Sequence, residues 1–203
     1  MNARLHLVLA SASPRREDLL RQAGYRFVVR PPGDVDERLV GHAPTPGAFV
    51  ESLAYLKAAA AIEKHGLADA LVLGADTAVE LNGRLLGKPA DEADARRILA
   101  LLAGSEHRVL TGLALVEAAR GRRWLAHDTT VVRMRPMSPA EIAAYVSSGE
   151  ALGKAGAYAL QETADRYVES IRGSYTNVVG LPMELLERLL KASGHDPSEF
   201  RDL

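Results

Sequence analysis

Apolar runs alternate with amphipathic segments over the first third of the chain. The apolar run at residues 5–10 predicts a strand, and the segment 15–23, which ends at a glycine, carries leucines on one side and predicts a helix. Residues 27–30 predict a second strand. After a loop rich in proline, glycine and acidic residues, a Thr-Pro pair predicts the start of a long helix that ends near residue 65.

The middle of the chain shows the same alternation. Residues 71–73 predict a short buried strand that ends at a glycine, and Asn82-Gly83 between apolar segments predicts a hairpin turn. Residues 91–102 predict a second amphipathic helix. Two long strands are then expected at 109–117 and 124–134, and the second alternates polar with apolar residues as a half-exposed strand does.

The last third begins with Ser138 and Glu141, which have the spacing of a helix capping box and predict a helix as far as Gly149. Strands are expected at 158–160 and 167–171. A final amphipathic helix is expected at residues 182–192, and we expect the polar tail from residue 195 onward to be poorly ordered.

This order of strands and helices predicts an α/β fold. No internal repeat or low-complexity linker interrupts the 203 residues, so we expect a single domain covering residues 1–203, built either as one core or as two small lobes that share a cleft.

Charge and composition narrow the classes of function. Lys and Arg number 25 against 26 Asp and Glu, a formal net charge of -1, so we expect no general attraction to nucleic acid or to a membrane surface. The chain has no cysteine, which excludes disulfides and thiolate chemistry. With no signal-peptide pattern and no apolar stretch near the roughly 20 residues of a membrane span, we expect a cytoplasmic protein.

The most informative stretch is SASPRRE at residues 11–17, between the first predicted strand and the first predicted helix. Ser13 is a candidate helix cap, and Pro14 suits the first helical position. A helix N-terminus with two hydroxyls and two guanidinium groups is a candidate phosphate site at the carboxyl end of a strand. The alternative is that Arg15 and Arg16 are solvated surface charges.

Three other segments place polar groups where an apolar run ends. LVLGADT delivers Asp76 and Thr77 to the end of a predicted strand, where an aspartate suits general-base or metal chemistry, although an aspartate that caps a turn is equally compatible. LLGKP holds Lys88 beside a proline. In GEALGKAGAYALQ, Lys154 lies among glycines, and Gln161 has an amide able to read a base edge.

Several familiar motifs are absent from the sequence, among them GxxxxGK[ST], GxGxxG, HExxH and GxSxG. The six histidines have no ligand spacing, so we interpret them as structural or exposed. The segment GSYTNVVGLP, residues 173–182, is a glycine-bounded loop for which packing and binding roles both stay open.

Taken in order, SASPRRE, the VDE that contains Glu37, the LAYLKA that contains Lys57, GADT, GKP, KAGAYALQ and GSYTNVVGLP resemble the motif series of the Maf family of nucleotide pyrophosphatases. The resemblance spans residue 7 to about residue 190. It implies an elongated mixed β-sheet flanked by helices, in two lobes around a deep cleft, as in the inosine triphosphate pyrophosphatases. It also implies a cytoplasmic homodimer that uses a divalent cation, Mg²⁺ or Mn²⁺, to hydrolyse nucleoside triphosphates to the monophosphate and pyrophosphate.

The resemblance implies roles for individual residues. Asp76 is the expected proton acceptor, and Asp76 and Glu37 are the expected metal ligands. The expected phosphate-binding residues are Ser11, Ser13, Arg16, Lys57, Lys88 and Lys154. Arginine suits bidentate phosphate contacts and lysine suits point-charge contacts, which agrees with this assignment.

Three positions separate the substrate branches of the family. Arg15, Thr77 and Gln161 match the branch that acts on dTTP and UTP, whereas tryptophan, glutamine and glutamate mark the branch that acts on 7-methyl-GTP. A glutamine amide pairs with the mixed donor and acceptor edge of uracil or thymine. The sequence therefore favours a dTTP and UTP pyrophosphatase, with a 7-methyl-GTP pyrophosphatase and a nucleotide-binding regulator of cell division as alternatives.

Two features depart from the family pattern. Gly153 stands where the family often has an aspartate before the KAG lysine, and residues 162–165 replace a glycine-rich segment.

Overall fold

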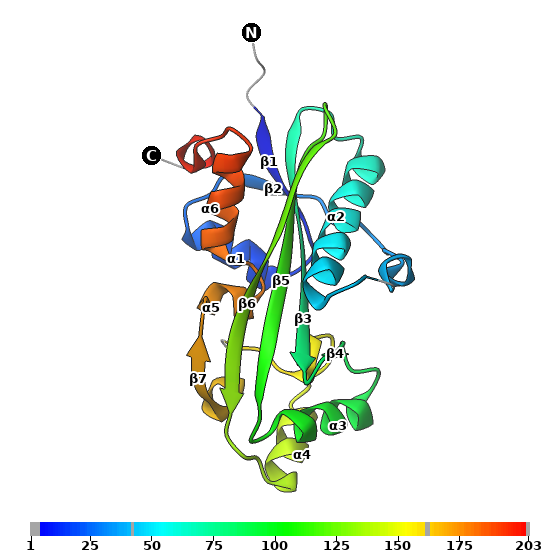
Figure 1. Cartoon of the computed structure of the whole chain (residues 1–203), viewed down its shortest axis with the longest axis vertical. Coiled ribbons are helices and arrows are strands. Elements are labelled where there is room, and N and C mark those ends of the chain that lie inside the picture. The colour runs from blue at the N-terminus through cyan, green and yellow to red at the C-terminus, as the bar shows by residue number, and fades with distance from the viewer. Residues whose placement is uncertain (1–4, 42, 161–162, 202–203) are drawn as a thin grey trace. The chain divides into compact units, whose positions relative to one another are not determined.

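The structure is a computed structural model that describes residues 5–41, 43–160 and 163–201. Seven strands form one mixed sheet in the order β2-β1-β3-β5-β6-β7, with β4 paired to β3 (Figure 1). The strands are β1 (His6–Ala10), β2 (Phe27–Val29), β3 (Ala70–Leu81), β4 (Arg84–Leu86), β5 (Glu106–Glu117), β6 (Arg122–Met134) and β7 (Val168–Arg172). The predicted α/β class, a mixed sheet flanked by helices, is confirmed.

Six α-helices accompany the sheet in the described part of the chain. They are α1 (Pro14–Gln22), α2 (Pro46–His65), α3 (Glu92–Leu102), α4 (Pro139–Ser147), α5 (Tyr175–Val179) and α6 (Met183–Ala192). The short 3-10 turns are η1 (Glu37–Val40), η2 (Ala155–Ala157), η3 (Thr163–Tyr167) and η4 (Pro197–Phe200). All five helices predicted from the sequence are present, and α5 is the one that the sequence did not predict.

Local capping explains why the predicted helices begin where they do. The Thr45 side chain accepts a hydrogen bond from the Ala48 amide at the start of α2, 3.1 Å. Ser138 and Glu141 form the complete capping box of α4. Among the described helices, none combines the length with the apolar composition that crossing a bilayer requires.

The chain divides into two compact units. Unit 1 comprises Met1–Asp76, Thr111–Asp128 and Gly180–Leu203, and unit 2 comprises Thr77–Leu110 and Thr129–Val179. The boundary passes through β3 between Asp76 and Thr77. The single domain and the cleft between two lobes stay predictions.

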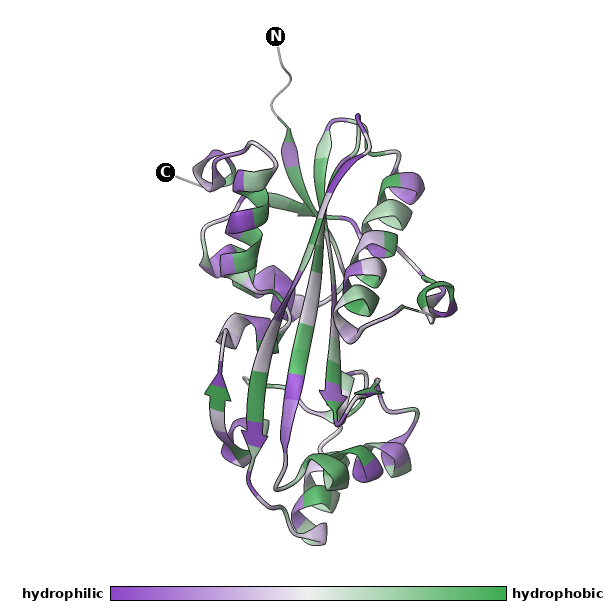
Figure 2. Cartoon of the chain, viewed as in Figure 1, coloured by the Kyte–Doolittle hydropathy of each residue, from purple (hydrophilic) through white to green (hydrophobic). Residues whose placement is uncertain are grey.

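Unit 1 is built around β1, which is buried on both faces. Leu7, Val8, Leu9 and Ala10 are all 1% exposed or less. Figure 1 shows α2 on one side of these strands, with α1 and α6 on the other. Along α6, four buried leucines alternate with exposed charged residues, and Figure 2 shows the matching mixture of green and purple on this helix.

Two glycines let α2 lie against the sheet of unit 1. A Cβ on Gly74 of β3 would lie 2.0 Å from the Ala54 carbonyl oxygen, and one on Gly112 of β5 would lie 2.3 Å from the Val50 carbonyl carbon. Only glycine permits this backbone approach. The glycine of GADT is therefore a packing residue, and it sets the distance between α2 and the end of β1.

β3 is longer than the sequence predicted. The sequence placed Asp76 after the end of this strand, and that expectation is wrong. β3 continues from Ala70 to Leu81, so Asp76 lies within it. The partner strand β1 ends opposite Gly74, at the pair Ala10 and Gly74. Asp76 thus lies beyond the carboxyl end of the parallel β1–β3 ladder, although its own strand goes on to pair with β4.

The hairpin prediction is confirmed, and the strand expected at residues 158–160 is absent. Leu81 pairs with Arg84 across Asn82 and Gly83, which both have positive φ, 51° and 82°. Residues 158–160 form no strand, because they follow η2 in an irregular segment.

The C-terminal tail is ordered as far as Arg201. The Arg26 amide donates to the Phe200 carbonyl, 2.6 Å, and the Arg201 guanidinium donates to Glu187, 2.5 Å, and to the Tyr25 hydroxyl, 3.1 Å. Tyr25 and Arg26 lie far from the tail in sequence, so the polar composition of the tail gave no sign of these two partners.

The core of unit 2 contains a polar pair. His107 is 2% exposed, and its Nε2 lies 2.7 Å from the Tyr158 hydroxyl. Its Nδ1 is buried without a hydrogen-bond partner in the described part of the structure. Burial lowers the pKa of His107 to about 4 and raises that of Tyr158, so both side chains are neutral in the folded protein at neutral pH.

The buried histidine predicts a loss of stability in acid. An unfolded histidine takes up a proton below about pH 6.5, whereas folded His107 stays neutral down to about pH 4, so acid favours the unfolded chain in this window. Urea unfolding measures the free energy of unfolding at pH 7 and at pH 4.5. We expect its decrease between these two pH values to be about 2 kcal/mol smaller in His107→Gln than in the wild type. His65→Gln, at an exposed position, is the control. Equal acid sensitivity in all three proteins would contradict the prediction.

Candidate active site

Two predicted site residues lie at the carboxyl end of the parallel pair β1 and β3 in unit 1. Ser11 follows the last residue of β1, and Asp76 lies two residues beyond the last β3 residue that pairs with β1. Both are buried, with 6% and 8% of their surface exposed. The carboxyl edge of parallel strands is where open α/β sheets bind ligands.

Asp76 forms an ion pair with Lys57 of α2. The Lys57 Nζ donates to Asp76 Oδ1, and the two side chains are 18% and 11% exposed. A carboxylate so little exposed requires a compensating charge. LAYLKA therefore belongs to the site because α2 brings its lysine to Asp76.

Arg16 is the second cation in this part of unit 1. Its Nη1 donates to Ser11 Oγ, 3.2 Å, and to the Ala75 carbonyl, 2.9 Å, and its Nε donates to the Gly180 carbonyl, 2.8 Å. Burial lowers the pKa of Arg16, and the charge of Asp76 opposes that shift. The structure thus brings Ser11, Arg16, Lys57 and Asp76 together.

The start of α1 differs in one respect from the prediction. Ser13 occupies the N-cap position before Pro14, but its side chain makes no capping hydrogen bond. Its amide instead donates to Ser11 Oγ, 3.2 Å. Ser13 is half-buried, and because its side chain makes no capping hydrogen bond, its hydroxyl does not cap α1.

Of four other predicted residues, the structure describes the side chains of two. Arg15 is half-buried on α1, and Thr77 is half-buried on β3 in unit 2. Glu37 begins η1, but its side chain lies outside the described part of the structure. Gln161 lies outside the described residues.

The two lysine loops of unit 2 lie side by side. The Gly156 amide donates to the Gly87 carbonyl, 3.1 Å, which joins the loop of Lys88 to that of Lys154. Gly156 has φ 72°, and a Cβ there would lie 2.7 Å from a methyl carbon of Val79. Gly153 also has positive φ, 73°, which favours the glycine found at this position.

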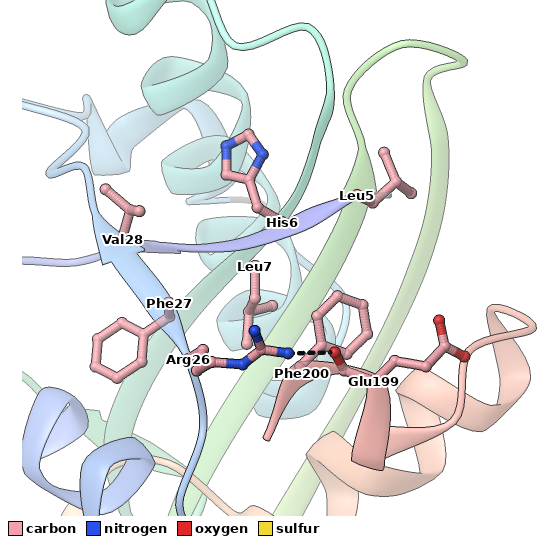
Figure 3. A pocket seen from close by; sticks show the side chains of 8 residues that line it. All are labelled: Leu5, His6, Leu7, Arg26, Phe27, Val28, Glu199 and Phe200. Atoms are coloured by element: carbon pink, nitrogen blue, oxygen red, sulfur yellow. Dashed lines mark hydrogen bonds between the residues drawn. The ribbon is translucent and has the colours of Figure 1, made fainter. Parts of the chain in front are cut away.

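A pocket of about 290 Å³ lies elsewhere in unit 1 (Figure 3). It is lined by Leu5, His6, Leu7, Arg26, Phe27, Val28, Glu199 and Phe200. Leu5 to Leu7 lie at the start of β1, whereas Ser11 follows its end. The pocket contains no predicted site residue and does not belong to the candidate site.

The described side chains are compatible with a divalent cation only if a ligand completes its coordination. In residues 5–41, 43–160 and 163–201, no three His, Asp or Glu side chains are grouped closely enough to hold a metal ion. Mg²⁺ commonly takes one or two carboxylates and fills its other positions with water and substrate phosphates. The carboxylate of Asp76 fits that kind of site.

Two contacts of the segment GSYTNVVGLP were not foreseen from the sequence. Asn177 is fully buried in unit 2 and donates to the Val109 carbonyl and to Thr130 Oγ1, each at 2.9 Å. In unit 1, Gly180 supplies the carbonyl that Arg16 Nε binds. The packing role left open for this segment is therefore present. A backbone acceptor 164 positions away has no signature in the sequence.

The fold is a mixed α/β sheet in which Lys57, Arg16 and Ser11 surround a buried aspartate just beyond the carboxyl end of β1. A family model described as Maf-like protein matches residues 6–193, and the chain belongs to the Maf family.

Two relatives share about half of their sequence with this chain. The dTTP/UTP pyrophosphatase of Moorella thermoacetica is 50% identical over 190 residues, covering 94% of this chain and 96% of the relative. That of Pelotomaculum thermopropionicum is 48% identical, covering 94% and 97%.

A solved structure of a nucleoside-triphosphatase, a dITP/XTP pyrophosphatase from Mycobacterium abscessus, covers 93% of this chain and 94% of its own at 15% identity. The TM-score of the two structures is 0.44.

The ion pair predicts a measurable coupling between Lys57 and Asp76. Lys57→Met leaves a buried carboxylate with one cation fewer and should lower the free energy of unfolding by about 2 kcal/mol or more. The double variant with Asp76→Asn should be more stable than the sum of the two single changes implies, by about 1 kcal/mol or more. Urea denaturation at pH 7 measures all three, with Lys64→Met at an exposed position of α2 as the control. Additive effects would show that the pair contributes no coupling.

Proposed function

We propose that the protein is a nucleoside triphosphate pyrophosphatase that hydrolyses dTTP and UTP to the monophosphate and pyrophosphate. The observation that carries the proposal is the buried carboxylate of Asp76. It lies beside Lys57 and Arg16, just beyond the carboxyl end of β1. Relatives that match nearly the whole chain at 48–50% identity bear the name dTTP/UTP pyrophosphatase, which supports the choice of substrate.

In this proposal Asp76 accepts a proton from the water that attacks between the α and β phosphorus atoms. Asp76, with Glu37, also holds a divalent cation, Mg²⁺ or Mn²⁺. When bound, such a cation neutralises phosphate charge.

The triphosphate carries about four negative charges, which the proposal assigns to several residues. The phosphate-binding set comprises Ser11, Ser13, Arg16 and Lys57 in unit 1, and Lys88 and Lys154 in unit 2. Ser13 is suited to this role because its hydroxyl caps no helix. The hydrogen bond between Gly87 and Gly156 keeps the two lysine loops of unit 2 adjacent, which supports a shared task for them.

Arg15, Thr77 and Gln161 are proposed to select the base. A nucleotide-binding regulator of cell division is the alternative from another class, but a buried carboxylate repels anions and is unnecessary for binding alone, which favours catalysis. A homodimer in the cytoplasm, without nucleic-acid partners, completes the proposal.

The activity is tested with purified protein, Mg²⁺ or Mn²⁺, and each of dTTP, UTP, the other common triphosphates and 7-methyl-GTP. We expect pyrophosphate release to be fastest with dTTP and UTP, because the base-selecting positions carry Arg, Thr and Gln. Faster release from 7-methyl-GTP would overturn the substrate assignment. Nucleotide binding without pyrophosphate release from any substrate would favour the regulator.

Asp76→Asn should lower kcat by about 100-fold or more, because the amide cannot accept the proton. Binding of a non-hydrolysable α,β-methylene analogue of dTTP should be largely retained, since the phosphate-binding side chains remain. Asp69→Asn, at an exposed position just before β3, is the matched control. Turnover close to that of the wild type would remove Asp76 from its catalytic role.

A further inference from the structure

Arg16 connects three segments of unit 1 that are distant in sequence. Its guanidinium donates to Ser11 at the end of β1, to Ala75 on β3, and to Gly180 shortly before α6. All three acceptors are protein oxygens, and two of them are backbone carbonyls. Arg16 therefore links these three segments of unit 1 through hydrogen bonds to the protein itself.

The contact with Ala75 lies next to the proposed catalytic residue. Ala10 and Gly74 are the last pair of the β1–β3 ladder, so the Ala75 carbonyl lies beyond the reach of β1. A buried backbone carbonyl requires a donor, and Arg16 Nη1 supplies one at 2.9 Å. The peptide unit that this hydrogen bond fixes joins Ala75 directly to Asp76.

We propose that Arg16 is a positioning residue, which fixes Asp76 by holding the Ala75 carbonyl against Ser11 and Gly180, rather than a bidentate ligand of the triphosphate. The inference rests on the proposed function and replaces the phosphate-binding role assigned there to Arg16.

The geometry of the guanidinium favours positioning over phosphate binding. A bidentate contact uses Nη2 together with either Nε or Nη1. In unit 1, Nε already donates to Gly180, and Nη1 donates to both Ser11 and Ala75. A phosphate could form a two-point contact only by breaking one of these hydrogen bonds, either the one from Nε to Gly180 or one of the two from Nη1 to Ser11 and Ala75.

The test compares Arg16→Lys with the wild type. Lysine keeps the positive charge but cannot reach three acceptors from one ammonium group. We expect kcat for dTTP with Mg²⁺ to fall about 30-fold or more, while the Kd of α,β-methylene-dTTP changes less than about threefold. Arg21→Lys is the matched control, because Arg21 lies on the same helix with an exposed side chain that pairs with Glu17 and lies over the Phe27 ring. Lys88→Gln provides the opposite pattern, a weaker Kd, as expected of a phosphate ligand.

Hydrogen–deuterium exchange gives a readout that does not depend on turnover. Peptides that contain Ser11, Ala75 and Gly180 should exchange faster in Arg16→Lys than in Arg21→Lys or the wild type. Unchanged exchange, or a Kd weakened about tenfold with kcat retained, would overturn the inference. If Arg16→Lys does not fold, the exchange measurement is made on Arg16→Gln, whose side-chain amide cannot reach all three acceptors. Unchanged exchange of the peptides that contain Ala75 and Gly180 in that protein would overturn the inference.

The two proposals fail separately. If wild-type protein releases no pyrophosphate from any triphosphate, the proposed function is wrong, and the exchange measurement still decides whether Arg16 holds the three segments. If the wild type turns over dTTP and the Arg16→Lys protein loses affinity instead of kcat, only the positioning role is wrong.

Discussion

The candidate site depends on the cost of burying the carboxylate of Asp76. The residue is 8% exposed, and an unpaired charge at that depth is strongly unfavourable. Lys57 from α2 and Arg16 from α1 provide the compensation. Both helices must therefore pack closely on the strands of unit 1, and Gly74 and Gly112 allow α2 to do so. The packing of unit 1 and the charge balance of its site are thus parts of one constraint.

The two adjacent arginines of SASPRRE differ because they lie on a helix. Consecutive helical residues point about 100° apart, so only one of the pair can turn toward Asp76. Arg16 takes the hydrogen bonds to backbone carbonyls, and Arg15 stays half-buried with a different orientation. A motif that looks like one cluster of positive charge therefore contains two side chains with different surroundings.

In unit 2, backbone and core contacts hold the motif KAGAYALQ in place. The glycines of KAGAYALQ permit a tight loop, Gly156 binds the backbone of Gly87, and Tyr158 is held by the buried His107. These contacts explain why residues 158–160 are irregular although their composition favours a strand. An apolar segment forms a strand only where a neighbouring strand accepts it, and this segment has other partners.

The sequence by itself determined the helices that carry their own caps, the Asn82-Gly83 hairpin, and the order of motifs that indicated the family, because each of these depends on residues close together in the chain. It also predicted Ser11, Arg16, Lys57 and Asp76 as one site. The tertiary structure alone decided that β3 continues beyond Asp76, that the polar tail packs against Tyr25 and Arg26, and that Arg16 binds the carbonyls of Ala75 and Gly180. Strand pairing and backbone acceptors are supplied by residues dozens to more than a hundred positions away, and a carbonyl oxygen is the same whichever residue bears it, so the sequence holds no mark of where such contacts form.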